Sequence, residues 1–187
     1  MPPKVKVTKE DIVLAAMEIV RREGVAAINA RTIAAGLGCS TQPIFSNFAT
    51  MEELKTAVIA QAEALCNQYV QTEVESGKYP VYKASGMAYI RFAKEESALF
   101  RLLFMRDRGG ETEGGADNLF TRMVTVVQGN TGLDFTDAQV FHLEMWAYVH
   151  GVATMMATGF FLPDWELVSR MLSDAYLGLR KHYGMEG

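Results

Sequence analysis

The chain has 187 residues, of which 49% are hydrophobic and 21% charged, a balance typical of a folded globular protein rather than a disordered one. No apolar run approaches the roughly 18 residues of a membrane-spanning helix, and no apolar stretch follows the positive charges at the start, which argues against secretion. Cys39 and Cys66 stand in no metal or redox spacing, so we expect reduced thiols, a cytoplasmic location and no metal or cofactor.

Charge is distributed unevenly along the chain. The net charge is −4, which by itself argues against a nucleic-acid partner. Residues 1–55, however, hold seven Lys or Arg against six Asp or Glu, whereas residues 56–187 hold eleven against sixteen. A slightly basic N-terminal unit joined to an acidic body fits a DNA-binding unit with a separate regulatory domain.

Capping signals at the start of the chain predict two helices. Thr8, with Asp11 three residues later, has the pattern of a capping box, and a continuous apolar face follows until Gly24 ends the helix. Asn29 can cap a second, short helix that ends at Gly38.

A third, very short helix and a long fourth one follow. Pro43 is tolerated only in a first turn, which sets the start of the third helix at Ser40 or Thr41. Thr50 with Glu53 forms another capping box, which opens a long helix.

The rest of the chain is also expected to be helical, with helices at about 80–94, 97–106, 117–128, 136–159 and 163–183. A capping box of Thr136 and Gln139 is expected to open the fourth of these, after a turn at 129–132. Residues 107–115, with four glycines and four charges, are expected to form a mobile loop. No strand pattern or internal repeat is present. We therefore predict an all-α fold of about nine helices, with a helix-turn-helix domain at 1–55 and a helical ligand-binding and dimerisation domain at 56–187.

The first three helices have the layout of a helix-turn-helix, because the second and third are short and joined by a glycine-containing turn. Small polar side chains stand early in the third helix, where Gln and Asn can pair with adenine and Ser or Thr can reach bases or phosphates. A solvated surface turn is the alternative for so short a polar helix. The candidate DNA-contacting residues are Arg31, Thr32, Ser40, Thr41, Gln42, Pro43, Phe45, Asn47 and Lys55.

Three segments carry a resemblance to a known family: Ile33–Ser40 (IAAGLGCS), Ile44–Phe48 (IFSNF) and Met51–Leu54 (MEEL). Together they resemble the N-terminal signature of TetR-family regulators, over about residues 8–58. The resemblance implies a transcription repressor that binds a palindromic DNA operator as a homodimer and is released by a small effector.

The sequence departs from the family pattern at three positions. Phe45 stands where the family usually has Tyr, Asn47 where it has His, and Met51 where it has Lys. In the family these side chains typically touch the phosphate backbone, so some of those contacts are in doubt here. Side chains able to compensate are Arg31, Lys55 and the N-terminal Lys4, Lys6 and Lys9.

The last two helices carry apolar stripes with steps of three and four residues. Such stripes fit an internal core face as well as a dimer interface. The resemblance implies the interface, because TetR-like proteins pair through their last two helices. The expected interface residues are Phe141, Met145, Tyr148, Val152, Met155, Trp165, Val168, Leu172, Ala175 and Leu179.

Eight of the eleven methionines lie beyond residue 56, together with several aromatic residues, as in pockets for small apolar molecules. An ordinary Met-rich core is the alternative. The stretch Trp146-x-x-x-His150-Gly151 is similar to one seen in a subgroup of the family, which makes His150 either a polar anchor for a ligand or a structural histidine. The expected pocket residues are Phe100, Phe104, Met105, Met123, Trp146, His150 and Met155, with Gly109–Gly115 as a lid.

Enzymes and interaction proteins without DNA binding are the two alternatives to a DNA-binding regulator. The sequence has no nucleotide-binding loop, hydrolase elbow or zinc-protease motif, and His142-x-Glu144 lacks the Pro-Cys-x-x-Cys of a zinc deaminase, so no enzyme is expected. The remaining alternative is an all-α interaction or small-molecule-binding protein without DNA binding.

Overall fold

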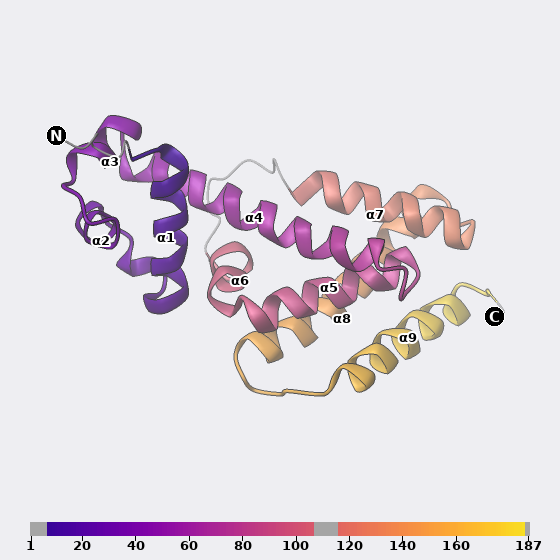
Figure 1. Cartoon of the computed structure of the whole chain (residues 1–187). Helices are drawn as coiled ribbons and strands as arrows, with labels where there is room; N and C mark the ends of the chain where they lie inside the picture. The colour runs from indigo at the N-terminus through magenta and orange to yellow at the C-terminus, as the bar shows by residue number, and fades with distance from the viewer. Residues whose placement is uncertain (1–6, 107–115, 186–187) are drawn as a thin grey trace. The chain divides into compact units, whose positions relative to one another are not determined.

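The computed structural model describes residues 7–106 and 116–185, and every regular element in these two ranges is helical (Figure 1). The predicted all-α fold is therefore confirmed. The helices are α1 (Lys9–Glu23), α2 (Ala30–Gly36), α3 (Gln42–Asn47), α4 (Met51–Glu75), α5 (Val81–Glu95), α6 (Ser97–Phe104), α7 (Ala116–Thr131), α8 (Phe135–Ala157) and α9 (Trp165–His182), with a short 3-10 turn at Val25–Ala27.

The chain divides into two compact units. The first unit comprises Met1–Asn67 and Glu96–Arg106, and the second comprises Gln68–Glu95 and Asp107–Gly187. The expected domain boundary at residue 55 thus falls inside α4, whose residues contribute to both units. Helix α6, which the sequence placed in the regulatory domain, packs against α1 in the first unit.

Side-chain caps start α1, α2 and α4 as predicted, whereas the expected Ser40 cap of α3 is wrong, because α3 begins after Thr41 with no side-chain cap. The Thr8 hydroxyl accepts a hydrogen bond from the Asp11 amide at 3.1 Å, and the Asp11 carboxylate accepts one from the Thr8 amide at 2.9 Å. Asn29 caps α2 by accepting from the amides of Arg31 and Thr32, and the Thr50 hydroxyl accepts from the Glu53 amide at 3.0 Å at the start of α4. Each cap satisfies backbone donors that the first turn of a helix leaves open.

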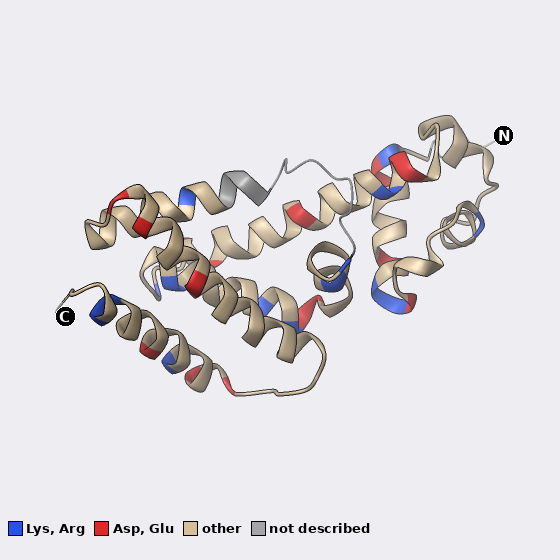
Figure 2. Cartoon of the chain, turned by 180° about the vertical axis from the view of Figure 1, so that it is seen from behind, with Lys and Arg blue, Asp and Glu red and all other residues tan. Residues whose placement is uncertain are grey.

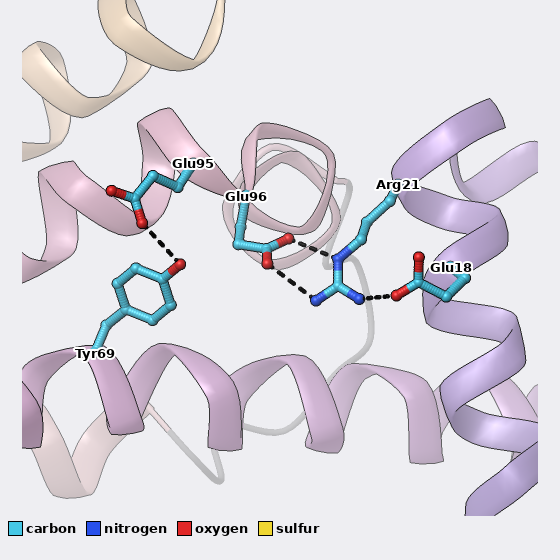
Figure 3. Close-up of polar contacts among 5 residues, drawn as sticks. All are labelled: Glu18, Arg21, Tyr69, Glu95 and Glu96. Atoms are coloured by element: carbon cyan, nitrogen blue, oxygen red, sulfur yellow. Dashed lines mark hydrogen bonds and ion pairs between the residues drawn. The ribbon is translucent and has the colours of Figure 1, made fainter.

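Apolar side chains from α1 to α4 and from α6 form the core of the first unit. One polar contact ties α1 to the residue before α6: Arg21 donates two hydrogen bonds to the Glu96 carboxylate, at 2.8 and 3.0 Å, and also contacts Glu18 (Figure 3). A bidentate pair of this kind has a defined geometry and orients both elements. The largest fully buried side chains here are Ile12, Val20, Ile33, Ile44, Leu54, Leu99, Phe100 and Leu103.

The second unit packs α5 against α7, α8 and α9 (Figure 1). Gly86 allows a close approach in this bundle, because a Cβ atom at that position would lie 3.0 Å from Leu172 of α9 and 3.5 Å from Val149 of α8. In the same unit the Tyr69 hydroxyl donates a hydrogen bond to Glu95 at 3.0 Å (Figure 3). The core is formed mainly by Met87, Ala88, Ile90, Phe92, Phe141, Met145, Val152, Val168 and Leu172.

Two expected details of the second unit are wrong. Helix α7 continues to Thr131, so the turn expected at 129–132 is reduced to Gly132, which takes a positive φ of 73°. Helix α8 starts before Thr136, because the Asp134 carboxylate accepts a hydrogen bond from the Asp137 amide at 2.9 Å. A carboxylate at this position also interacts favourably with the helix dipole, which makes Asp134 the effective cap. The loop and lid expected at 107–115 lie outside the described residues.

Candidate nucleic-acid interface

Helix α3 presents one exposed face, formed by Gln42, Phe45 and Ser46. Its opposite side is anchored by Ile44, which is 1% exposed. The helix begins after Thr41, one of the two starts that Pro43 allowed, and Pro43 occupies its first turn. Within the described residues the Gln42 side chain makes no hydrogen bond, so its amide is available to a partner.

The Asn47 side chain has a different environment from that of Gln42. It is half-buried, and its amide nitrogen donates to the carbonyl oxygens of Pro43 at 2.8 Å and Val7 at 3.4 Å. The Asn47 amide thus ties the end of α3 to the segment that leads into α1. Its expected role in pairing with a base is not supported by this position, because the amide donor is already used within the unit.

Helix α2 and the turn after it position the remaining candidates. Arg31 is exposed in the first turn of α2, and Ser40 is exposed just before α3. Thr32 is half-buried, and its hydroxyl completes the cap of α2 by accepting from the Asn29 amide at 3.2 Å while it donates to the Ala27 carbonyl at 2.7 Å. Gly38 takes a φ of 63°, as the tight turn between the two helices was expected to require.

Four cations of the first unit are engaged in ion pairs between described residues, namely Lys9, Arg21, Arg22 and Lys55. Lys9 pairs with Glu53 at 3.2 Å, and Lys55 pairs with Glu52 at 2.8 Å. Arg31 has no ion pair with the described residues, and Lys4 and Lys6 lie outside them. Among the predicted phosphate contacts that the structure describes, Arg31 is therefore the side chain with the least internal competition.

The segment from Thr32 to Met51 contains no charged residue, and α3 is correspondingly uncharged in Figure 2. This segment includes the whole exposed face of α3. Contacts by that face must therefore use hydrogen bonds and apolar packing, while attraction to phosphate must come from flanking cations. Met51, at the first position of α4, is half-buried.

A hollow that the sequence did not predict lies between α1 and α4, with a volume of about 650 Å³. Its lining includes the apolar Val13, Leu14 and Phe48 and the Lys9–Glu53 ion pair. The Lys9 ammonium lies 4.9 Å from the centre of the Phe48 ring. The hollow is open and belongs to the first unit, and none of the residues of the predicted ligand pocket lines it.

The predicted pocket residues are divided between the two units. Phe100, Phe104 and Met105 belong to the first unit, in which Phe100 is fully buried and Met105 is 47% exposed. Met123, Trp146, His150 and Met155 belong to the second.

Within the second unit the structure brings Trp146 and His150 together. Their rings stack with centroids 5.1 Å apart, and the His150 Nδ1 lies 3.0 Å from the Tyr89 hydroxyl. Burial lowers the pKa of His150 below its ordinary value. Met123 is buried in α7, and Met155 is half-buried in α8.

A second histidine, which the pocket prediction omitted, is more deeply buried. His142 is 7% exposed, and its Nδ1 lies 2.8 Å from the Tyr82 hydroxyl. Burial lowers the pKa of His142 to about 4 and raises the pKa of Tyr82, so both groups are neutral at pH 7. The rings of Phe120 and Tyr82 lie 4.7 and 5.7 Å from the His142 ring. The sequence signal that could have identified this site is that His142 directly follows Phe141, a residue of the apolar stripe, on the buried side of α8.

The expected dimer stripes include five residues that are buried inside the second unit, which corrects that prediction. A side chain that is buried in its own unit offers almost no surface to a partner, and the three-and-four spacing had matched the internal core. These five are Phe141, Met145, Val152, Val168 and Leu172. Of the others, Tyr148 is exposed, and Met155, Trp165, Ala175 and Leu179 are half-buried.

Helix α8 has a second side that is exposed and largely apolar, formed by Val140, Leu143, Ala147 and Gly151 together with Glu144. The whole helix carries only two charged side chains, Asp137 and Glu144, and is largely uncharged in Figure 2. A Cβ atom built on Gly151, or on Gly178 of α9, meets nothing within 4 Å. The loop after α8 adds exposed Phe160 (83%), Phe161 (41%) and Leu162 (61%).

Comparisons with known proteins place this geometry in context. A family model described as "Tetracyclin repressor-like, C-terminal domain" matches residues 82–175, half of the chain. The crystal structure of a TetR-like transcriptional regulator from Rhodococcus sp. RHA1 is similar, with 15% sequence identity and a TM-score of 0.70. The match covers 96% of this chain and 98% of that chain, and at this identity it shows a shared fold. No curated protein matches the sequence.

Two further features, a membrane-spanning helix and a metal-binding cluster, are absent from the described residues. None of their helices is long and apolar enough to span a membrane. Nor do they contain a group of three or more His, Cys, Asp or Glu side chains that could hold a metal ion.

Proposed function

Because the chain belongs to the TetR family of transcriptional regulators, which act by binding DNA and not as enzymes, we propose that it is a repressor. It binds a palindromic operator as a homodimer and leaves it when a small, largely apolar molecule binds. The observation that carries the DNA-binding part is the exposed, uncharged face of α3, which follows a tight turn at Gly38. This is the arrangement that a recognition helix needs to enter the major groove.

DNA contact is divided between base edges and phosphates. Gln42 offers an amide that can pair bidentately with adenine, and Ser40 adds an exposed hydroxyl. The exposed Ser46 hydroxyl donates to the Gln42 carbonyl oxygen at 2.9 Å and can still accept a hydrogen bond. Arg31 supplies phosphate contact from α2, together with Lys4 and Lys6. Because α3 has only six residues, one copy makes few contacts, and tight binding requires two.

The dimer forms through the exposed face of α8 together with α9. A glycine inside a helix costs about 1 kcal/mol relative to alanine, yet no described residue lies within 4 Å of a Cβ atom built on Gly151 or Gly178. Close approach by a helix of a second copy gives both glycines a role. Ala147 stands one turn before Gly151, so the two small residues form a shallow strip, and Val140 and Leu143 supply apolar area beside it.

The second unit binds the effector. The buried pair of Tyr82 and His142 offers hydrogen bonds without a net charge at pH 7, which suits an uncharged molecule. Phe120 and Tyr176 place further rings near this pair. Effector binding at this pair acts on the DNA-binding helices α1 to α3 through the long helix α4, which has residues in both units.

A band-shift assay tests this proposal. The full-length protein is mixed with DNA from upstream of its own gene and with a random-sequence duplex of equal length. We expect a retarded complex with the upstream DNA at nanomolar protein, and a weaker complex, formed only at higher protein concentration, for the Gln42→Ala variant. Absence of any sequence-specific complex, with a folded dimer, would favour an interaction protein without DNA binding.

A further inference from the structure

Phe45 is unusual among the phenylalanines of the first unit. Its side chain is 58% exposed, whereas Phe48 is 3% exposed and Phe100 is fully buried. Within the described residues it makes no ring-to-ring or cation–π contact. The folded chain therefore gains little from this ring, and keeping a phenyl group in water has a hydrophobic cost.

The surroundings of Phe45 limit what can contact it. Its exposed neighbours on α3 are the polar Gln42 and Ser46, and no charged residue lies between Thr32 and Met51. A single aromatic ring on a polar face is too small for a protein-docking patch, which needs contiguous apolar area. A phenyl ring has no hydroxyl, so it cannot hydrogen-bond a phosphate as a tyrosine would. Its partner must present an apolar group within a polar surface.

The major groove of DNA offers one such group, the 5-methyl of thymine. We propose that Phe45 is a specificity-determining residue that recognises a thymine by packing against this methyl group. The inference rests on the proposed function, because it requires α3 to enter the major groove. It gives Phe45 a role in base selection in place of the phosphate contact that the family resemblance implied.

The position of Phe45 relative to Gln42 predicts where the thymine lies. The two residues are three apart on one helix face, so their Cα atoms are separated by about 4.5 Å along the helix axis. This is close to the spacing of adjacent base pairs, about 3.4 Å. The thymine read by Phe45 is therefore expected next to the base pair read by Gln42, once in each half-site.

Replacing thymine with uracil tests the contact directly, because it removes only the methyl group. The full-length protein first selects its preferred duplex from random-sequence DNA. Each thymine of that duplex is then replaced in turn by uracil, and Kd is measured by fluorescence anisotropy at one salt concentration. Burial of one methyl group corresponds to about fourfold in Kd, so we expect one thymine per half-site whose replacement weakens binding by about that factor.

Variants connect the effect to the ring. Phe45→Ala should bind the thymine and uracil duplexes with equal Kd, whereas the matched variant Gln42→Ala should keep the fourfold difference. Phe45→Tyr should keep it too, since the ring remains. Folding of each variant is checked by thermal denaturation, and the measurements on the native protein need no variant.

The experiment distinguishes failure of the Phe45 inference from failure of the proposed function. A selected duplex with no uracil-sensitive thymine next to the Gln42 site, or an effect that persists in Phe45→Ala, would overturn the inference while leaving the proposed function intact. Failure to select any sequence would instead refute the proposed function, and with it the premise of the inference.

Discussion

The exposed faces of α3 and α8 are both poor in charge, yet they offer different chemistry. The α3 face presents an amide, a hydroxyl and one ring, from Gln42, Ser46 and Phe45. The α8 face presents small and aliphatic groups, among them Ala147 and Gly151. Hydrogen-bonding tips suit the edges of bases, whereas a strip of small residues suits another helix. Exposure alone therefore does not identify a partner, and the functional groups on each face do.

The largest effect is expected from a charge placed on the α8 face. A Cβ atom at position 151 meets no described atom within 4 Å, so the fold should accept Gly151→Glu, but a symmetric dimer would bring two such carboxylates close together. Like charges in contact cost several kcal/mol, so the dimer dissociation constant should rise by about a hundredfold or more. Sedimentation velocity measures this. The matched control is Gly129→Glu in α7, where the glycine is also exposed with open space around it. Equal dimerisation by both variants would show that α8 is not the interface.

His142, on the buried side of α8, should make the free energy of unfolding depend on pH. The pKa of His142 is about 4 in the folded protein and ordinarily about 6.5, so the unfolded chain takes up a proton first as the pH falls. The free energy of unfolding should therefore decrease between about pH 6.5 and 4, by up to roughly 3 kcal/mol. Urea titrations across this range measure it, with His142→Gln as the comparison. An identical pH profile for the variant would mean that His142 is solvated.

The side-chain amides of Gln42 and Asn47 allow a comparison of DNA binding and stability within α3. Gln42→Ala should weaken operator binding by about 1–3 kcal/mol and relax base preference at one position per half-site, without loss of stability. Asn47→Ala should instead lower thermal stability by about 1–2 kcal/mol, because it removes the bonds to Val7 and Pro43. Anisotropy titrations against a panel of operator variants, with melting curves, separate the two. Loss of base preference in Asn47→Ala at unchanged stability would reverse the assignment.

The smallest effect concerns phosphate contact near α3. Met51→Lys should steepen the dependence of log K on log salt concentration by about one unit, since one more phosphate is neutralised. Gln61→Lys, about 15 Å further along α4, adds the same charge and should change the slope less. The test is operator binding at several salt concentrations. Equal slopes for native and Met51→Lys proteins would mean that residue 51 does not face the backbone.

Local signals predicted the first unit well. The caps at Thr8, Asn29 and Thr50 depend on residues three positions apart, so the sequence contains all the information that they need. The Asn47 contact with Val7 spans 40 residues and leaves no local pattern.

The second unit was harder for the same reason. The hydrogen bond between Tyr82 and His142 spans 60 residues, and Gly86 is needed only because Leu172 packs beside it. The stripe through Phe141 and Met145 shows that α8 packs, but a periodic pattern does not say whether its partner is α5 or a second chain. Only the folded structure separates the buried from the exposed side.

The central claim is that two copies of the chain act together on one DNA site. Sedimentation equilibrium of the native protein, alone and with the selected operator duplex, tests it most directly. We expect a dimer of the 20.7 kDa chain at micromolar concentration and two chains on each duplex. A 20.7 kDa monomer that still binds the palindrome tightly as a single copy would contradict it.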